Sequence, residues 1–457
     1  YVAVKTRQQV AAAGGEVTVD FYLINEKNVR GNHQLKISVT DSQGKVMEVG
    51  TYETEAAGGE VYGQLLVKDV KIPVPTAGGL CRIEAKLCKE NSVVTTGYDD
   101  ILSVNLASNM LDGKGAVWED GSALQNFLKG KTKEAVAAYE DNLGKLDWIM
   151  VARPPRKDQL TMVPMEALRS ADGKPGLDVV YYEDMEFQKE VYHEVAKVVN
   201  LSAIEGATPS PFVYMLDGYG IKWSGKVLPS VSGEYTIIPQ SNDRSMIEVF
   251  VNGKKIYEIT RKKEHFGDGK VYLKEGKSAD IEIRFRHPRS NARCRLDWAV
   301  PNDKMPDAQR LMERAVNDGT KIFIIQSADE WSEFIAANSK AVFKDKFFVG
   351  TNWLGGVMFN KPHDIFKELP VGNALNWPYQ ALIHTGVERM GLVMEGEELL
   401  VGAYHTYPMA IGTAMGIVPM GKGSVLFSTL DIYGNIINDS AAGLVAKKLI
   451  FNMIDFK

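Results

Sequence analysis

Apolar and polar residues alternate along several short runs in the first hundred residues. Three such runs span 17–23, 35–39 and 81–87. A period of two places every second side chain on the same face of a strand, so each run predicts a strand with one buried face. Turn sequences separate the runs, at 14–15, 41–44, 58–59 and 78–79. This spacing of strands and turns predicts an immunoglobulin-like β-sandwich over residues 1–108.

The hydrophobic period changes near residue 109. A strand is predicted at 116–118, a helix with Ser122 as its N-cap follows, and a buried strand comes at 148–151. The order strand, helix, strand is how an α/β layer begins.

The same pattern resumes after residue 301. A helix ends at Gly319, the continuously apolar run 322–325 follows, and a last helix carries apolar residues over 445–453. A strand that is apolar along its whole length must be covered on both faces, which indicates the interior of an α/β layer.

The stretch between the two α/β halves shows strand periodicity, which predicts a β domain inserted into an α/β domain. An insertion at a surface turn leaves both cores intact, and the turn at 174–176 is the predicted start. The domain organisation is therefore an immunoglobulin-like β-sandwich, two parts of one α/β domain, and a β-sandwich inserted between those parts. The respective boundaries are 1–108, 109–174 with 302–457, and 175–301.

Charge and composition exclude some classes of function. The chain has 53 Lys and Arg against 58 Asp and Glu, a net charge of -5, which argues against a nucleic-acid partner. Apolar runs fall short of the roughly 18 residues of a membrane-spanning helix.

The basic residues of 254–295 alternate with apolar ones, which predicts the solvent-exposed face of a strand, with an anion or acidic-glycan surface as the alternative. The three cysteines, Cys81, Cys88 and Cys294, lack metal-ligand spacing.

Motifs of the predicted insert occur in the order of a known family. They are Gly176-Leu177, Tyr181-Tyr182, Ile221 to Pro229, Ser232 to Thr236, Ser241-Asn242-Asp243, Val249 to Lys254 and Leu296-Asp297-Trp298. On these motifs the insert resembles a protective-antigen-type (PA-fourteen) β-sandwich. The resemblance implies glycan binding, since domains of this family commonly bind glycans and are often inserted in glycosidases.

The same resemblance implies where a sugar would bind. In the lectin members, adjacent aspartates at the position of Asn242-Asp243 hold a calcium ion that receives sugar hydroxyls. An Asn carbonyl brings no charge to a calcium site, so Asp243 is only a weak calcium candidate. The alternative is that Asn242 and Asp243 form a hydrogen-bonded turn without a metal ion. No other cofactor is expected. Tyr219 lies in a glycine-rich loop where an exposed ring could stack on a sugar. The candidate carbohydrate-binding residues are Asp217, Tyr219, Trp223, Asn242, Asp243 and Arg244.

The whole arrangement resembles the C-terminal region of large glycoside hydrolase family 2 enzymes, which are β-galactosidase-like. The supporting stretches are Ile24-Asn25-Glu26, Trp353 to Gly356, Trp377 to Gln380 and Glu395 to Ala403. The resemblance implies an upstream catalytic barrel as partner and a periplasmic or extracellular location. The α/β domain resembles the flavodoxin-like, or class I glutamine amidotransferase-like, fold.

No catalytic residue is predicted in this chain. A retaining glycosidase needs two carboxylates about 5 Å apart at the ends of barrel strands, and the eight-fold strand and helix repeat of such a barrel is absent from the sequence. The cysteine nucleophile of active amidotransferases is also absent from both α/β segments. The predicted function is carbohydrate binding and domain assembly within a glycoside hydrolase. The alternatives are a free-standing carbohydrate-binding surface protein, or an α/β hydrolase that uses Ser327 with His384 or His405.

Overall fold

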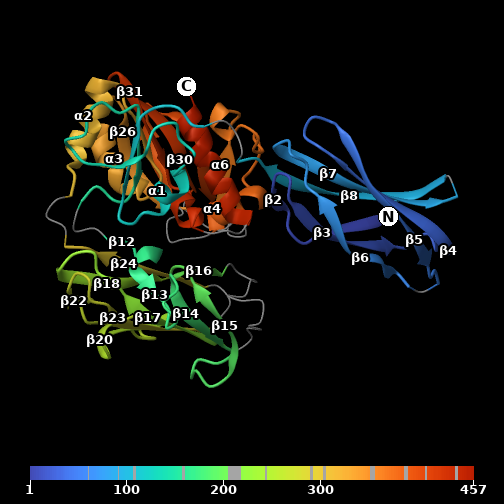
Figure 1. Ribbon diagram of the computed structural model, residues 1–457, viewed down its shortest axis with the longest axis horizontal. Coiled ribbons are helices and arrows are strands. Elements are labelled where there is room, and N and C mark those ends of the chain that lie inside the picture. Colours follow the sequence, from blue (N-terminus) through green and yellow to red (C-terminus); the bar gives the residue numbers. More distant parts are fainter. Residues whose placement is uncertain are drawn as a thin grey trace. The chain divides into compact units, whose positions relative to one another are not determined.

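The structure is a computed structural model of the chain. It describes residues 1–59, 61–90, 92–106, 110–156, 160–203, 218–241, 244–288, 292–301, 305–349, 356–384, 390–406, 409–437 and 441–456. By their internal contacts the residues form two compact units. Figure 1 labels the helices and strands. Unit 1 comprises 1–110, 360–380 and 438–457, and unit 2 comprises 111–359 and 381–437.

Two sheets form the N-terminal sandwich of unit 1. The first sheet has the order β1 (Val2–Thr6), β3 (Glu16–Ile24), β6 (Gly63–Pro73). The second has the order β2 (Val10–Ala12), β8 (Ser92–Val104), β7 (Gly79–Lys89), β4 (Gly31–Thr40), β5 (Val46–Ala56). The alternating runs predicted as strands are β3, β4 and β7, and their apolar positions, such as Phe21, Ile37 and Ile83, are at most 1% exposed.

Two later stretches of the chain belong to unit 1 as well. They contain the 3₁₀ turns η3 (Asp364–Phe366) and η4 (Trp377–Tyr379) and the helix α6 (Ala441–Asp455). The buried ammonium of Lys448 donates to Glu368 at 2.5 Å and to the carbonyl of Asn105 at 3.2 Å. These bonds connect α6 to both other parts of the unit.

A mixed ten-stranded sheet forms the α/β part of unit 2. Its main path is β10 (Ala137–Ala138), β9 (Gly115–Glu119), β11 (Trp148–Ala152), β25 (Lys321–Ile324), β31 (Gly423–Ser428), β30 (Met409–Met420), β28 (Met390–Glu395), β26 (Val342–Phe348). Off this path, β29 (Glu398–Thr406) pairs with β30 and with β27 (Gly356–Asn360). The first five strands of the path are parallel, and the remaining pairs along the path, together with β29 and β30, are antiparallel.

The helices of this part are α1 (Ala123–Leu128), α2 (Ala308–Asp318), α3 (Ala328–Ala337), α4 (Gln380–His384) and α5 (Ile432–Ile436). Asp307 caps the N-terminus of α2, since its side chain accepts from the backbone N–H groups of Gln309 and Arg310. Gly319 caps the C-terminus, in the left-handed region with φ 80°. Both α2 and the apolar strand β25 lie where the periodicity predicts them.

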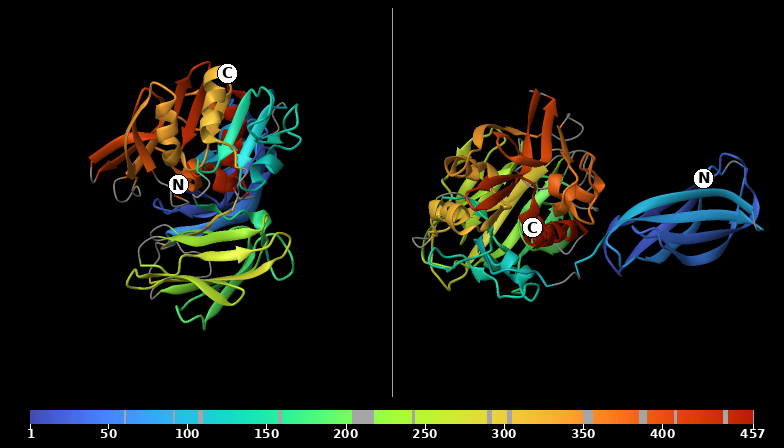
Figure 2. Two further views of the ribbon diagram at one scale, coloured as in Figure 1. Left: turned by 90° about the vertical axis from the view of Figure 1, so that its left-hand side faces the viewer. Right: turned by 90° about the horizontal axis from the view of Figure 1, so that it is seen from above.

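The sequence between β11 and α2 folds into a second sandwich. Its smaller sheet has the order β12 (Thr161–Met162), β24 (Ala292–Ala299), β18 (Gly233–Ser241), β22 (Lys270–Leu273), with β16 (Asn200–Ala203) also on β24. Its larger sheet has the order β15 (Glu190–Ala196), β14 (Leu177–Tyr182), β17 (Tyr219–Val227), β23 (Ala279–His287), β19 (Met246–Val251), β20 (Lys254–Ile259), β21 (His265–Phe266), with β13 (Leu168–Arg169) also on β17. One apolar cluster fills the space between these sheets. Figure 2 draws most of their strands in green and yellow. Strands β12 and β13 belong to this sandwich although they precede residue 175.

The protein is therefore multidomain and mostly β-sheet, with few helices. Among the described helices, none combines the length and apolar character needed to cross a membrane.

Asp20 makes a buried polar contact between β3 and β6 that responds to pH. Its carboxylate accepts the backbone N–H of Asp69 at 2.8 Å and a guanidinium hydrogen bond from Arg7 at 3.1 Å. The Asp69 N–H, followed by Arg7, holds the pKa of Asp20 below its ordinary value. We predict that Asp20→Asn lowers the stability of unit 1 at neutral pH, because the ionised carboxylate is the better acceptor.

This difference in stability should shrink as pH falls. A depressed carboxyl pKa contributes stability above the unfolded value of about 3.9, and that stability is lost as pH falls through the folded value. Calorimetric melting of wild type and variant from neutral to strongly acidic pH measures the gap. A gap that stays constant across the acidic range would show that the charge of Asp20 plays no part.

Candidate functional site

The larger sheet of the insert brings several strand ends to one edge. Strands β17, β23 and β19 are antiparallel neighbours, and their register pairs Tyr219 with His287 and Met246 with Arg286. The start of β17, the end of β23 and the start of β19 therefore meet at the same edge. We call the described residues there the loop edge; they are Gly218, Arg244, Ser245, His287 and the turn 183–189 that follows β14.

Specific contacts order the loop edge. The hydroxyl of Ser245 lies 3.2 Å from Nδ1 of His287, and both residues are buried. The guanidinium of Arg286 donates to the carbonyl of Met185 at 3.1 Å and lies 4.7 Å from the ring centroid of Phe187. The carboxylate of Asp184 accepts the backbone N–H groups of three later residues of its own turn. The turn is therefore held both internally and by β23.

The structure describes three of the six candidate residues: Arg244, which is exposed, and Tyr219 and Trp223, which are buried. Asp217, Asn242 and Asp243, and with them the calcium candidate, lie outside the described residues. Arg244 is exposed, with its backbone in the left-handed region at φ 73°. Its charged side chain is available at the loop edge.

Tyr219 and Trp223 correct an expectation. Tyr219 was expected to be exposed, but it is 0% exposed, and Trp223 is 3% exposed. Tyr219 is the first residue of β17 and not part of a loop. Alternate side chains of a strand share a face, so Tyr219, Ile221 and Trp223 all face the core. A ring with both faces packed cannot serve as a stacking platform for a sugar.

The basic run of 254–295 is paired with acidic side chains where it lies on the outer face of the larger sheet. Lys255 contacts Glu248 at 3.2 Å, and Arg286 contacts the same carboxylate at 2.9 Å. Arg284 contacts Glu282 at 2.6 Å. These partners neutralise the cluster locally, as expected of a solvated strand face.

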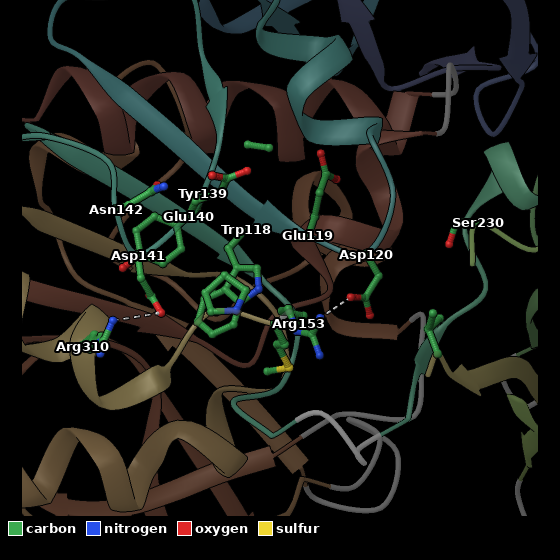
Figure 3. Close-up of a pocket in the computed structure, with 14 residues that line it drawn as sticks. Trp118, Glu119, Asp120, Tyr139, Glu140, Asp141, Asn142, Arg153, Ser230 and Arg310 are labelled. Carbon is green, nitrogen blue, oxygen red and sulfur yellow. Dashed lines mark hydrogen bonds and ion pairs between the residues drawn. The ribbon is translucent and has the colours of Figure 1, made fainter. Parts of the chain in front are cut away.

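A pocket of about 680 Å³ opens in the α/β part of unit 2 (Figure 3). Its lining comes largely from residues at or just after the carboxyl ends of β9, β10 and β11. They include Trp118, Glu119, Asp120, Tyr139, Glu140, Asp141, Asn142 and Arg153. Met305, Pro306 and Arg310, at the start of α2, close another side, and Ser230 and Val300 of the insert complete the lining.

Glu119 takes the capping role that was expected of Ser122. Ser122 makes no side-chain hydrogen bond to the helix backbone, whereas the Glu119 carboxylate accepts the N–H groups of Leu124 at 3.0 Å and Gln125 at 2.9 Å. It also accepts the hydroxyl of Tyr433 at 2.8 Å. Burial raises the pKa of Glu119 above its ordinary value, against these three donors. The longer Glu side chain reaches the helix terminus from the end of β9.

Arg153 lies at the inner wall of the pocket. Its guanidinium pairs with Asp120, and it lies 5.6 Å from the ring centroid of Trp118. The side chains of Arg153 and Asp120 are only 7% and 15% exposed. Burial lowers the pKa of Arg153, and the carboxylate of Asp120 opposes that effect. The pair is thus a desolvated donor and acceptor group beside the cavity.

Sequence reasoning missed this pocket, although a usable signal was present. The polar residues Glu119, Asp120 and Arg153 directly follow two predicted strands. Ligands of open α/β sheets bind outside the carboxyl ends of the strands, where the strand order reverses.

Ser327 lies on the tight turn from β25 to α3, in the left-handed region at φ 54°. Such strand-to-helix turns hold the nucleophile in some hydrolases. Within the described residues, however, no hydrogen bond joins its hydroxyl to a histidine. The described part of the chain likewise holds no group of three or more His, Cys, Asp or Glu residues suited to a metal ion.

Comparison with protein families assigns the insert. Residues 173–310 match the family model described as PA14 domain. The insert is PA14-like. The anti-sigma-I factor RsgI3 of Acetivibrio thermocellus is 27% identical over 127 residues, which are 27% of this chain and 19% of that protein. The chain therefore spans about a fifth of the length of this curated relative.

Three of the solved structures with partial similarity are compared by identity, coverage and TM-score. An anti-sigma factor domain-containing protein is 14% identical, covers 66% of this chain and 89% of its own, and has a TM-score of 0.24. A β-glucosidase from Kluyveromyces marxianus is 14% identical, covers 50% of this chain and 30% of its own, and has a TM-score of 0.33. A PA14 sugar-binding domain from an RTX adhesin is 13% identical, covers 27% of this chain and 88% of its own, and has a TM-score of 0.22.

Two buried tyrosines of the PA14-like insert provide a matched test of the burial argument. Tyr219 and Tyr235 are both 0% exposed. The Tyr235 hydroxyl donates to the carbonyl of Val231 at 3.0 Å, whereas the Tyr219 hydroxyl has no hydrogen-bond partner among the described residues. Tyr235→Phe should therefore destabilise the insert by about 1–3 kcal/mol, and Tyr219→Phe should leave its stability unchanged or higher.

Chemical denaturation of the full chain measures both effects. Equal destabilisation by the two variants would show that the Tyr219 hydroxyl has a hydrogen-bond partner, and it would contradict this prediction.

Proposed function

We propose that this chain is the carbohydrate-binding, non-catalytic region of a polysaccharide-degrading enzyme, and that the loop edge of the PA14-like insert receives the glycan. The observation that carries the proposal is the match of residues 173–310 to the PA14 domain. The similar domain of the RTX adhesin is described as sugar-binding.

The chemistry of the loop edge supports this location. Arg244 presents an exposed guanidinium, whose N–H groups can donate to sugar hydroxyl oxygens. Its neighbour Ser245 is buried and hydrogen-bonded to the buried His287, which fixes the position of the backbone next to Arg244. The turn 183–189 adds further backbone and side-chain polar groups. Asp217, Asn242 and Asp243 flank the described residues of the same edge in sequence, and we propose them as further ligands of the sugar.

The proposed domain organisation keeps the predicted parts, residues 1–108, 109–174 with 302–457, and the insert 175–301. Two changes apply: β12 and β13 already pair with strands of the insert, and 360–380 and 438–457 pack in unit 1. The α/β part would be flavodoxin-like. Its five parallel strands, numbered in chain order, lie in the order 2-1-3-4-5, which is the order of flavodoxin-like sheets. A glycoside hydrolase family 2 parent, with its catalytic barrel upstream, and a periplasmic or extracellular location complete the proposal.

Glycan binding by the full chain is the first test. On an array of neutral and acidic glycans the wild type should bind at least one group of related structures. Arg244→Ala should weaken that binding by about tenfold, since a hydrogen bond to a charged group contributes about 1.5–3 kcal/mol. Lys254→Ala is the matched control, because it removes an exposed positive charge beyond the other end of β19.

Chelation of calcium should leave this binding in place, because Asn242 supplies no charge to a calcium site. A blank array for the wild type, or equal losses in Arg244→Ala and Lys254→Ala, would contradict the placement of the glycan at the loop edge.

Turnover of glycosides tests the non-catalytic part of the proposal. The purified chain should hydrolyse none of a panel of nitrophenyl glycosides, because the carboxylate pair of a barrel is not expected in it. Reproducible hydrolysis that disappears on substitution of one of its own carboxylates would overturn this assignment. Activity lost in Ser327→Ala would instead support the α/β hydrolase alternative.

A further inference from the structure

The pocket beside Arg153 occupies the position where open α/β sheets bind small molecules. In the parallel strands, β9 is the first in sequence, β10 lies on one side of it and β11 on the other, so the strand order reverses at β9. The crevice outside the carboxyl ends of strands at such a reversal is the usual ligand site of these folds. Its volume of about 680 Å³ lies within the range of small-molecule pockets.

The charges of the lining select against anions. Four carboxylates line the pocket, those of Glu119, Asp120, Glu140 and Asp141, against the two guanidinium groups of Arg153 and Arg310. Each guanidinium is already close to a carboxylate: Arg153 pairs with Asp120, and Arg310 lies 4.0 Å from Asp141. A phosphate or a carboxylate ligand would therefore meet more repulsion than attraction.

The Arg153 and Asp120 pair offers a buried donor beside a partly buried acceptor. Nε of Arg153 donates to the carbonyl of Pro154 at 3.2 Å, and Nη1 donates to Asp120. Among the described residues, Nη2 has no hydrogen-bond partner, and the side chain that carries it is 93% buried and lines the cavity. Figure 3 shows this guanidinium and the Asp120 carboxylate at the pocket wall. Because Arg153 lines the cavity, this N–H group can donate to a ligand oxygen there.

Neighbouring groups hold this pair in position. Nε1 of Trp331 donates to the backbone carbonyl of Arg153 at 2.7 Å, and the ring of Trp331 packs edge-on against that of Trp118, with centroids 5.7 Å apart. Trp118 in turn lies under the guanidinium. The donor and the acceptor are therefore preorganised, which lowers the cost of binding a ligand between them.

We propose that this pocket binds a short neutral saccharide. A hydroxyl group both donates and accepts, so two adjacent hydroxyls can satisfy the Asp120 carboxylate and the free Nη2 of Arg153 together. Asp141 and Arg310 repeat this pairing at the rim, where their side chains are 22% and 67% exposed. Both pairs line the same pocket, so a disaccharide has more hydroxyl groups to meet them than a monosaccharide has. This site belongs to the α/β part and is independent of the loop edge.

Calorimetric titration of the full chain with glucose, galactose, xylose, cellobiose and lactose tests the proposal. The titrations are made in the Arg244→Ala background, so that a glycan at the loop edge contributes less. At least one of these sugars should bind, and a disaccharide should bind more tightly than its monosaccharides. Asp120→Asn and Arg310→Ala should each weaken binding by about fivefold or more, as expected for loss of a charged hydrogen-bond partner. Arg156→Ala, which removes an arginine outside the pocket lining, should have no effect.

Arg310 is the safer probe of the two because it is largely exposed, so its loss should not disturb folding. Thermal melting of each variant identifies any loss of structure in Asp120→Asn. The proposal is overturned if none of the five sugars binds, if binding is unchanged in Arg310→Ala and Asp120→Asn, or if inorganic phosphate or glucosamine binds more tightly than every neutral sugar. These outcomes do not decide the loop-edge proposal, because that test compares the glycan binding of Arg244→Ala with that of Lys254→Ala.

Discussion

The parallel pairing of β11 with β25 is the interaction on which unit 2 depends. Trp148 to Val151 pair in register with Lys321 to Ile324, although the whole PA14-like insert lies between them in sequence. Side chains reinforce the pairing: the hydroxyl of Thr320 donates to the carbonyl of Leu146 at 2.8 Å, and Trp331 donates to the carbonyl of Arg153 at 2.7 Å. Because adjacent strands receive the two ends of the insert, the sandwich can fold on its own core without opening the sheet.

The same pairing positions the chemistry of the α/β part. Arg153 follows β11 directly, and its guanidinium reaches Asp120, which follows the neighbouring strand β9. Tyr139 and Asp141 come from the region after β10, where Arg314 of α2 donates to the Tyr139 hydroxyl at 3.2 Å and to the carbonyl of Asp141 at 3.0 Å. Strand order, more than any local motif, thus assembles a polar pocket from distant parts of the sequence.

Local patterns were enough to predict many of the elements. The alternation of β3, the continuous apolar run of β25 and the glycine that ends α2 each reflect one strand or helix and its burial. The sequence motifs of the insert likewise agreed with the family match. Such features depend on neighbouring residues, so a single sequence contains them.

Features that depend on tertiary position were missed. Tyr219 was expected to be exposed in a glycine-rich loop, yet it begins β17. It lies two residues before the buried Ile221, so both side chains point to the same, inward face of the strand. Ser122 has good N-cap chemistry, but the carboxylate of Glu119 reaches the same N–H groups from the end of β9. The pocket was overlooked because its residues come from three strands whose adjacency the periodicity does not reveal.

The central claim is that the loop edge of the PA14-like insert binds a glycan. Hydrogen–deuterium exchange of the full chain, with and without the glycan that binds best, tests it most directly. The account predicts slower exchange in the turn 183–189 and at residues 244–246, with the hairpin turn at Asn252 and Gly253 unchanged. Protection confined to other parts of the chain, or absent from the insert at a saturating glycan concentration, would contradict it.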